Sequence, residues 1–300
     1  MIEVWTSLIR SFVTGHGDPA EDPAGRQRSV KYLNGLVDCA DSDCLPGQFT
    51  FSGQGIGNSS GKENGFGDVD GDGDIDVMVA NFSGPNQLWL NDGNGNFTDS
   101  GQLLGNSQSN ALQLGDLDGD GDLDAIISNG SSGNPQIPNK VWFNDGTGIF
   151  SDSGQELGVY ISVSVQLADL DNDGDLDAFF SNGLNGPGQP NEVYLNDGLG
   201  NFTDSGQALG LTDGFAVLAD LDNDGDIDAF VACYLSRQDR VWLNDGFANF
   251  TDTGQRLGNS ISHGADLADI DNDGDTDAIV ANILGGGARL WLNDGSCIRL

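Results

Sequence analysis

A nine-residue acidic pattern, Asp-x-Asp-x-Asp-Gly-Asp-x-Asp, occurs five times in this 300-residue chain and constrains its fold more than any other feature. The copies begin at Asp68, Asp116, Asp169, Asp220 and Asp269. Successive copies are about fifty residues apart, a period typical of repeat architectures. The fold must therefore place five similar units next to one another.

Each repeat holds four segments that we expect to form short β-strands. One leads into the acidic pattern, and a second follows it as an apolar run such as Val77–Ala80. A third ends in the turn signal Asn-Asp-Gly, as in Leu88–Gly93, and a fourth resembles Asn96–Gln102. Four such strands cannot bury both faces of their sheet, so radial stacking into a β-propeller is predicted. A linear β-solenoid is the alternative, but its repeats are usually shorter, about 20 to 30 residues.

The predicted fold is all-β, a five-bladed β-propeller of four-stranded blades with an N-terminal arm. Residues 1–46 form the arm and linker, and residues 47–300 form the propeller. The last repeat stops at Trp291–Gly295 without its fourth strand, whereas Phe49–Ser52 matches that strand and precedes the first acidic pattern. We predict that Phe49–Ser52 pairs with the strand around Trp291 and closes the ring.

The net charge of −36 excludes nucleic acids and anionic membrane surfaces as partners, because those require clustered Lys and Arg. Five patterns of five aspartates hold 25 of the 47 acidic residues, so the charge is concentrated. No segment approaches the roughly 20 apolar residues of a membrane-spanning helix. The start, Met1–Arg10, is a poor signal peptide because Glu3 and Arg10 interrupt it, so we expect that a signal has been removed or that the gene start is missing.

The acidic patterns are predicted to bind calcium. Five carboxylates within nine residues repel one another unless a divalent cation lies between them, and ligand sets made only of oxygen favour calcium. The first, third, fifth and ninth aspartates are expected to offer side chains, and the seventh its backbone carbonyl. About five Ca²⁺ ions would thus be held by Asp68, Asp70, Asp72, Asp74 and Asp76; Asp116, Asp118, Asp120, Asp122 and Asp124; Asp169, Asp171, Asp173, Asp175 and Asp177; Asp220, Asp222, Asp224, Asp226 and Asp228; and Asp269, Asp271, Asp273, Asp275 and Asp277.

These loops are not EF-hands, because the twelfth position, which would be a bidentate Glu, is apolar in every copy. Loops such as Ala168–Asp177 instead resemble FG-GAP/VCBS repeats, and the resemblance spans roughly residues 47–296. It implies an integrin-α-like propeller with calcium between the first and second strands of each blade, and an extracellular or cell-surface location. The best-known relatives have seven or more blades, whereas this chain has five repeats. We expect the calcium to be structural.

The N-terminal arm, residues 1–46, leaves two interpretations open: it packs on its own propeller, or it docks on a neighbouring molecule and builds a head-to-tail polymer. Cys39 and Cys44 are close enough in sequence for a small disulfide. For Cys233 and Cys297, a disulfide and buried thiols are both open. The six Asn-x-Ser/Thr sites leave glycosylation open at Asn58, Asn81, Asn96, Asn129, Asn201 and Asn249.

Catalysis is not expected. His16 and His263 are the two histidines, and no unique carboxylate pair stands apart from the repeats. The expected function is an extracellular, calcium-stabilised structural or adhesion module that assembles into a filament through its arm, with a protein, a further copy of itself or a glycan as partner. One alternative is a carbohydrate-binding propeller with aromatic residues between its blades. The other is a polysaccharide lyase, for which Arg237 and Arg240 are the one nearby basic pair.

Overall fold

The computed structural model describes residues 49–57, 60–106, 108–134, 137–158, 160–183, 188–210, 214–234, 238–283 and 287–295. The predicted arm, with Cys39, Cys44 and His16, lies outside these residues, as do Arg237 and Cys297. The described residues form nineteen β-strands in five antiparallel sheets, which we call blades 1 to 5 in chain order. No helix among them is long and apolar enough to cross a lipid bilayer.

Each blade is a meander in which strands adjacent in sequence pair with one another. Blade 1 contains β1 (Gly61–Gly67), β2 (Asp76–Asn81), β3 (Gln87–Asn91) and β4 (Phe97–Asp99). Blade 2 contains β5 (Ser109–Gly115), β6 (Asp124–Asn129), β7 (Lys140–Asn144) and β8 (Phe150–Asp152). Blade 3 contains β9 (Ser162–Ala168), β10 (Asp177–Asn182), β11 (Glu192–Asn196) and β12 (Phe202–Asp204). Blade 4 contains β13 (Gly214–Ala219), β14 (Asp228–Cys233), β15 (Arg240–Leu243) and β16 (Thr251–Asp252), and blade 5 contains β17 (Ile261–Ala268), β18 (Asp277–Ile283) and β19 (Ala288–Trp291).

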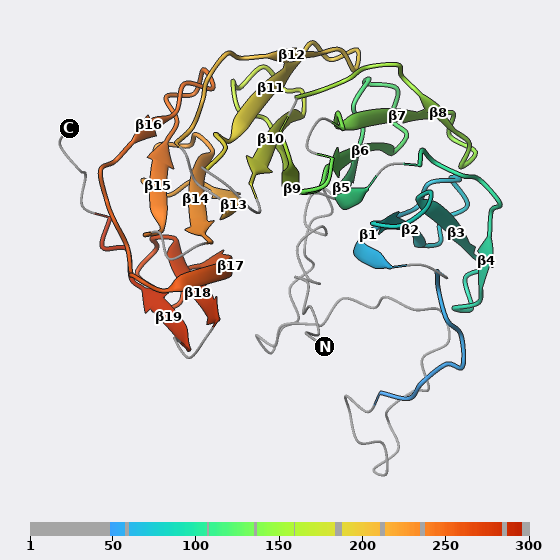
Figure 1. Ribbon diagram of the computed structural model, residues 1–300, viewed down its shortest axis with the longest axis horizontal. Coiled ribbons are helices and arrows are strands. Elements are labelled where there is room, and N and C mark those ends of the chain that lie inside the picture. Colours follow the sequence, from blue (N-terminus) through green and yellow to red (C-terminus); the bar gives the residue numbers. More distant parts are fainter. Residues whose placement is uncertain are drawn as a thin grey trace, which may run out of the picture.

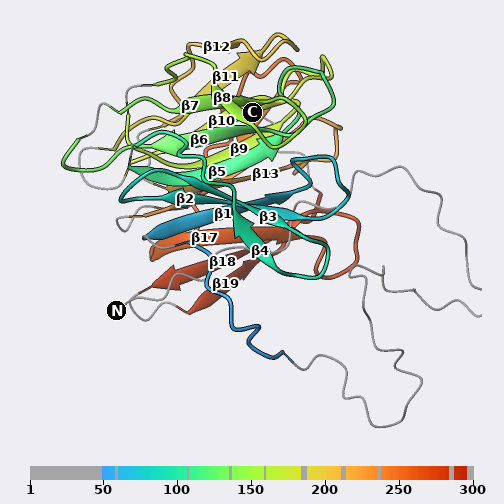
Figure 2. The ribbon, with the colours of Figure 1, turned by 90° about the vertical axis from the view of Figure 1, so that its right-hand side faces the viewer.

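The blades are arranged around a common centre in a propeller-like fold. The first strands of neighbouring blades, β1, β5, β9, β13 and β17, contact one another in that order and lie on the inner side of the arc, while β4, β8, β12 and β16 lie toward its rim (Figure 1). The side view shows neighbouring sheets stacked with their strands running in similar directions (Figure 2). The predicted all-β architecture, with four strands in each of the first four blades, is confirmed.

The predicted ring closure within one chain is not present, and that prediction is wrong for this structure. Phe49–Ser52 is not part of a strand, and β19 pairs only with β18 among the described residues. Phe49–Gly57 continues into blade 1, at the opposite end of an open arc from β19 (Figure 1). Packing between neighbouring blades sets the curvature of the array, and the five blades form an open arc that leaves β1 and β19 apart (Figure 1).

The core lies between the blades rather than inside each sheet. The second strand of each of the first four blades is buried along its whole length. Neighbouring blades cover both faces of β6, β10 and β14, whereas β2 packs on blade 2 through one face only. Between blades 2 and 3, for example, Ile126 and Val141 meet Ala178, Tyr194 and Phe202 in one cluster. The apolar run after each acidic pattern is therefore the part of the repeat that holds adjacent blades together.

Candidate metal centres

The five acidic patterns form the loops between the first and second strands of the blades. Each loop turns sharply through a glycine at its sixth position, such as Gly73 with φ +92°. The fourth position is also left-handed: it is Gly71 and Gly119 in the first two loops, and an asparagine with φ near +60° in the other three. Asparagine tolerates this conformation better than most residues with a side chain, so all five loops can follow a similar path.

Each loop brings three carboxylates to one point. In the first four loops they belong to the first, third and ninth aspartates, and their oxygens lie within 4.8 Å of one another. In the last loop the group consists of the first, third and fifth aspartates. The groups are Asp68, Asp70 and Asp76; Asp116, Asp118 and Asp124; Asp169, Asp171 and Asp177; Asp220, Asp222 and Asp228; and Asp269, Asp271 and Asp273.

The ninth aspartate anchors each loop from inside the blade. In blade 3, Asp177 is fully buried, and its two carboxylate oxygens accept hydrogen bonds from the backbone N–H groups of Leu170 (2.9 Å) and Asn196 (2.8 Å). Burial raises the pKa of Asp177 to about 6, and it raises that of Asp228 to about 7. In blade 5 the amide hydrogen bond from Asn293 outweighs desolvation and lowers the pKa of Asp277.

The first aspartate stabilises the turn of the loop through hydrogen bonds to its backbone. The two oxygens of Asp68 accept hydrogen bonds from the N–H groups of Gly71 and Gly73, each at 2.9 Å. The fifth aspartate, predicted as a side-chain ligand, lies outside the carboxylate group in the first four loops; Asp72 Oδ1 accepts the N–H of Asp74 at 2.9 Å instead.

The seventh aspartate directs its side chain away from the carboxylate group. The Asp74 carboxylate lies against Gly93, in the turn between β3 and β4, where any side chain at position 93 would collide with it. The same contact joins Asp122 to Gly146 and Asp175 to Gly198. The glycine of Asn-Asp-Gly is therefore favoured by its positive φ, +72° at Gly93, and a side chain there would also displace the Asp74 carboxylate.

The carboxylate groups fit a divalent cation. Three of their oxygens, Asp171 Oδ1, Asp220 Oδ1 and Asp222 Oδ1, are buried without a hydrogen-bond donor. A carboxylate oxygen removed from water without a donor is costly, and a hard cation compensates that cost. The set contains only oxygen and carries several negative charges, which suits Ca²⁺ better than zinc or copper. Calcium, when bound here, would cancel the repulsion between the carboxylates.

The asparagine of Asn-Asp-Gly ties each acidic loop to the next blade, a role that the sequence analysis missed. Asn144 Nδ2, in blade 2, donates to the backbone carbonyl of Val69, inside the loop of blade 1, at 2.7 Å. The same bond joins Asn196 to Leu117 (2.8 Å) and Asn244 to Leu170 (2.8 Å). The signal was visible in the sequence, because this asparagine is present in all five repeats although many hairpin turns do without it.

A glutamine after the fourth strand forms a second tie, which we call the glutamine clamp. Gln155, which follows the last strand of blade 2, reaches the turn before β12 in blade 3. Its Nε2 donates to the carbonyl of Gly200 at 2.7 Å, and its Oε1 accepts the N–H of Phe202 at 2.9 Å. Gln102 and Gln207 make the equivalent pair of bonds at the preceding and following junctions. Each of these junctions is thus fixed by an asparagine and a glutamine.

A profile described as an FG-GAP-like repeat matches the chain at residues 68–127, 116–180, 169–231 and 220–280. No curated protein matches it. Similar solved structures include a lectin from Agrocybe aegerita that specifically recognises non-reducing terminal N-acetylglucosamine, with 20% identity and a TM-score of 0.49 over 78% of this chain and 63% of that one. A rhamnogalacturonan lyase from Bacillus licheniformis has 15% identity and a TM-score of 0.47, covering 79% and 51% of the two chains. The V. cholerae biofilm matrix protein Bap1 has 18% identity and a TM-score of 0.45, covering 74% and 35%.

This chain spans less than two thirds of the length of each of these three proteins. The four profile matches overlap into one stretch, residues 68–280, which is more than half of the chain. That stretch contains all five acidic patterns and the strands that enter and leave most of them. By this match, the chain belongs to the FG-GAP-like repeat family.

Proposed function

We propose that this chain is an extracellular, calcium-stabilised module with a structural or adhesive role, and that it associates with further copies of itself. The observation that carries the proposal is the set of acidic loops: buried carboxylate oxygens without donors lie in loops that are hydrogen-bonded to the next blade. A cation bound in such a loop would stabilise a blade and a junction together. FG-GAP-like repeats are typical of extracellular proteins, where calcium near millimolar keeps even weak sites occupied.

Removing calcium tests this proposal. Each site saturated at about 100 times its Kd contributes about 2.7 kcal/mol, and a domain of this size loses about 2–4 °C for each kcal/mol. We therefore expect EDTA to lower the melting temperature by more than about 10 °C in differential scanning calorimetry, and excess Ca²⁺ but not Mg²⁺ to restore it. Elemental analysis of the dialysed protein should find about five calcium ions per chain, one for each carboxylate group. An EDTA melting curve identical to the calcium curve would contradict the proposal.

We propose no catalytic role. His263, the one histidine among the described residues, packs against the rings of Phe215 and Tyr234, with centroids 5.4 Å and 6.2 Å away. Arg240, one of the two basic residues considered for a lyase, is paired with Asp252 at 3.1 Å. Both observations favour structural roles for these side chains. Release of unsaturated sugars from acidic polysaccharides, followed by ultraviolet absorbance, would contradict this part of the proposal.

Carbohydrate binding through aromatic residues between the blades is not favoured. The aromatic side chains at the junctions, such as Trp142, Phe202 and Trp242, are each at most 9% exposed and belong to the core clusters. They are therefore not available to stack on a sugar ring. A glycan array probed with the calcium-loaded protein tests the point, and saturable binding would revive the alternative.

A further inference from the structure

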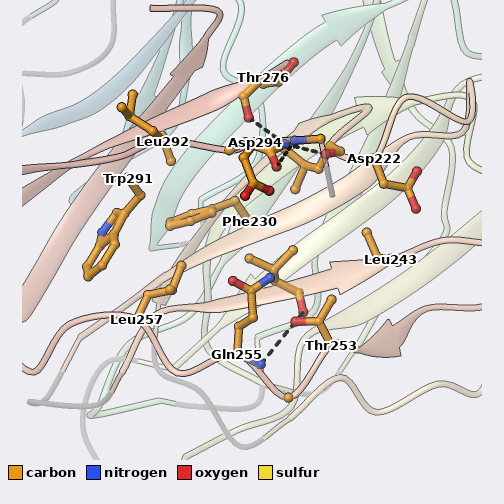
Figure 3. Close-up of a pocket in the computed structure, with 16 residues that line it drawn as sticks. Asp222, Phe230, Leu243, Thr253, Gln255, Leu257, Thr276, Trp291, Leu292 and Asp294 are labelled. Atoms are coloured by element: carbon orange, nitrogen blue, oxygen red, sulfur yellow. Dashed lines mark hydrogen bonds between the residues drawn. The ribbon is translucent and has the colours of Figure 1, made fainter. Parts of the chain in front are cut away.

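A cavity of about 580 Å³ lies between blades 4 and 5 (Figure 3). Its walls include Phe230 and Val241 from blade 4, Leu257 from the segment after β16, and Trp291 from blade 5. Gln255 also lines it, next to Thr253 (Figure 3). The cavity therefore combines apolar walls with polar groups such as Thr253, Thr276 and Asn293.

The other junctions fill the equivalent position with a phenylalanine. Phe150, Phe202 and Phe250, each the first residue of a fourth-strand pattern, are only 6%, 8% and 7% exposed and belong to the clusters between successive blades. Phe250 packs edge-on against Phe179, with ring centroids 5.7 Å apart. The counterpart of Phe179 in blade 4 is Phe230, which lines the cavity. The cavity is therefore shaped for the phenylalanine of a fourth strand.

The outer edge of blade 5 is uncovered in the same region. Leu290 is 49% exposed because no blade follows blade 5, whereas its counterparts Val141 and Val193 are fully buried against the next blade. Leu292 is 57% exposed. Among the described residues β19 pairs with β18 on one side and with no strand on the other, and an unpaired strand edge beside a cavity is a template for strand addition.

One segment of this chain carries the sequence that fits. Phe49–Gln54 reads Phe-Thr-Phe-Ser-Gly-Gln and matches Phe97–Gln102, which reads Phe-Thr-Asp-Ser-Gly-Gln. The side chains of Phe49 and Phe51 are 98% and 86% exposed, so neither packs into the core of the described residues.

Gln54 already forms a glutamine clamp on blade 1. Its Nε2 donates to the carbonyl of Gly95 at 3.2 Å, and its Oε1 accepts the N–H of Phe97 at 2.9 Å. Gln102 makes these two contacts with the turn of blade 2. Phe49–Gln54 therefore stands where the fourth strand of a blade preceding blade 1 would end, and the remaining three strands of such a blade match β17, β18 and β19.

We propose that the edge of β19 and its cavity bind Phe49–Gln54 of a second copy of this chain, which completes blade 5. The proposal rests on the self-association proposed above and names its contact. The chain's own segment does not reach the groove, because Gln54 holds it on blade 1 at the far end of the arc (Figure 1). Pairing within one chain would require the open arc to close, whereas pairing with a second copy leaves the arrangement of the five blades unchanged (Figure 1).

The register follows from the complete blades. In blade 1, Asn91 pairs with Phe97 and Leu90 with Thr98. By the same offset, Asn293 of one copy would pair with Phe49 of the other, and Leu292 with Thr50. The Phe49 ring would then enter the cavity against Phe230, and Gln255 Oε1 would accept the Phe49 N–H, as Gln155 Oε1 accepts that of Phe202.

Mixed single-cysteine variants test this pairing, because only a bond between two chains can join them. Thr50→Cys protein and Leu292→Cys protein, both calcium-loaded, are mixed and oxidised. The Cα atoms of directly opposed strand residues are about 5.5 Å apart, a separation at which two cysteines can form a disulfide. We expect a product of twice the chain mass on a non-reducing gel. Each variant oxidised alone controls for the native cysteines. The double variant Thr50→Cys/Leu292→Cys is oxidised in parallel. A crosslink that forms only in this double variant and runs at monomer mass would overturn the proposal, as would the absence of any crosslink.

Point variants provide the second measurement. Phe49→Asp and Gln255→Ala should each weaken self-association about tenfold or more in sedimentation analysis, because they remove the buried ring or its clamp. Phe247→Asp is the matched control, since Phe247 is 73% exposed but lies away from the groove lining, and it should leave association unchanged. If the protein self-associates but neither groove variant weakens it, this contact is wrong while self-association stands. A protein that is monomeric throughout would refute both.

Discussion

Truncation of one glutamine clamp, Gln155→Ala, gives a direct measure of what holds two blades together. The substitution removes the bond from Gln155 Nε2 to the Gly200 carbonyl (2.7 Å) and the bond from the Phe202 N–H to Oε1 (2.9 Å). It leaves a partly buried donor and acceptor without partners, at about 1–2 kcal/mol each. We therefore expect a loss of about 2–4 kcal/mol, which lowers the melting temperature by about 4–16 °C in a domain of this size.

The chain contains its own control for this experiment. Gln255 occupies the same repeat position, but in the described residues its side chain makes no hydrogen bond across a junction. Gln255→Ala should change the melting temperature of dilute, monomeric, calcium-loaded protein by less than about 1 °C. The measurement is thermal unfolding followed by near-ultraviolet circular dichroism. Equal shifts for the two variants, or no shift for Gln155→Ala, would refute the assignment of the clamp.

Three further outcomes are expected. Gly198→Ala should cost about 1–3 kcal/mol more in urea unfolding than Gly206→Ala, because both glycines have φ above +70° but only at position 198 would the new methyl group meet a carboxylate; equal costs would contradict the contact. Asp171→Asn should lower the calcium content by one ion per chain in elemental analysis and leave the other sites filled; an unchanged content would argue against this ligand. In the metal-free protein, burial raises the pKa of Asp228 to about 7, above its unfolded value near 3.9. The unfolded state therefore loses this proton more readily, and the free energy of unfolding decreases as the pH rises between these two values. The melting temperature of metal-free protein should fall between about pH 4 and pH 7, whereas that of calcium-saturated protein should rise, because binding requires ionised carboxylates; parallel pH profiles would contradict this reasoning.

The local features of this protein could be predicted from its sequence because each is encoded within one repeat. The acidic loops, the buried strands after them and the Asn-Asp-Gly turns depend on residues a few positions apart. The contacts that each aspartate of the loop makes were harder to predict. Asp72 was expected to contribute its side chain to the site, and its Oδ1 also accepts the N–H of Asp74, a local contact that residue type alone does not reveal.

The contacts between blades could not be predicted because their partners lie in different repeats. Nothing near Asn144 in sequence shows that its side chain reaches the carbonyl of Val69, 75 positions earlier. The ring closure failed for the same reason. Whether five blades close depends on the angle at each junction, which results from the packing of residues such as Phe202 against the preceding blade. The residue pattern of a single repeat does not determine that angle.

The use of one kind of junction throughout the array has a consequence for how such proteins change during evolution. Asn144, Asn196 and Asn244 reach back to the preceding blade in the same way, and Gln102, Gln155 and Gln207 reach forward. A duplicated or deleted gene segment of one full repeat would therefore bring or remove a matched pair of surfaces and leave the neighbours compatible. Unequal recombination between repeats can lengthen or shorten such a chain without new side chains having to be selected at the joint.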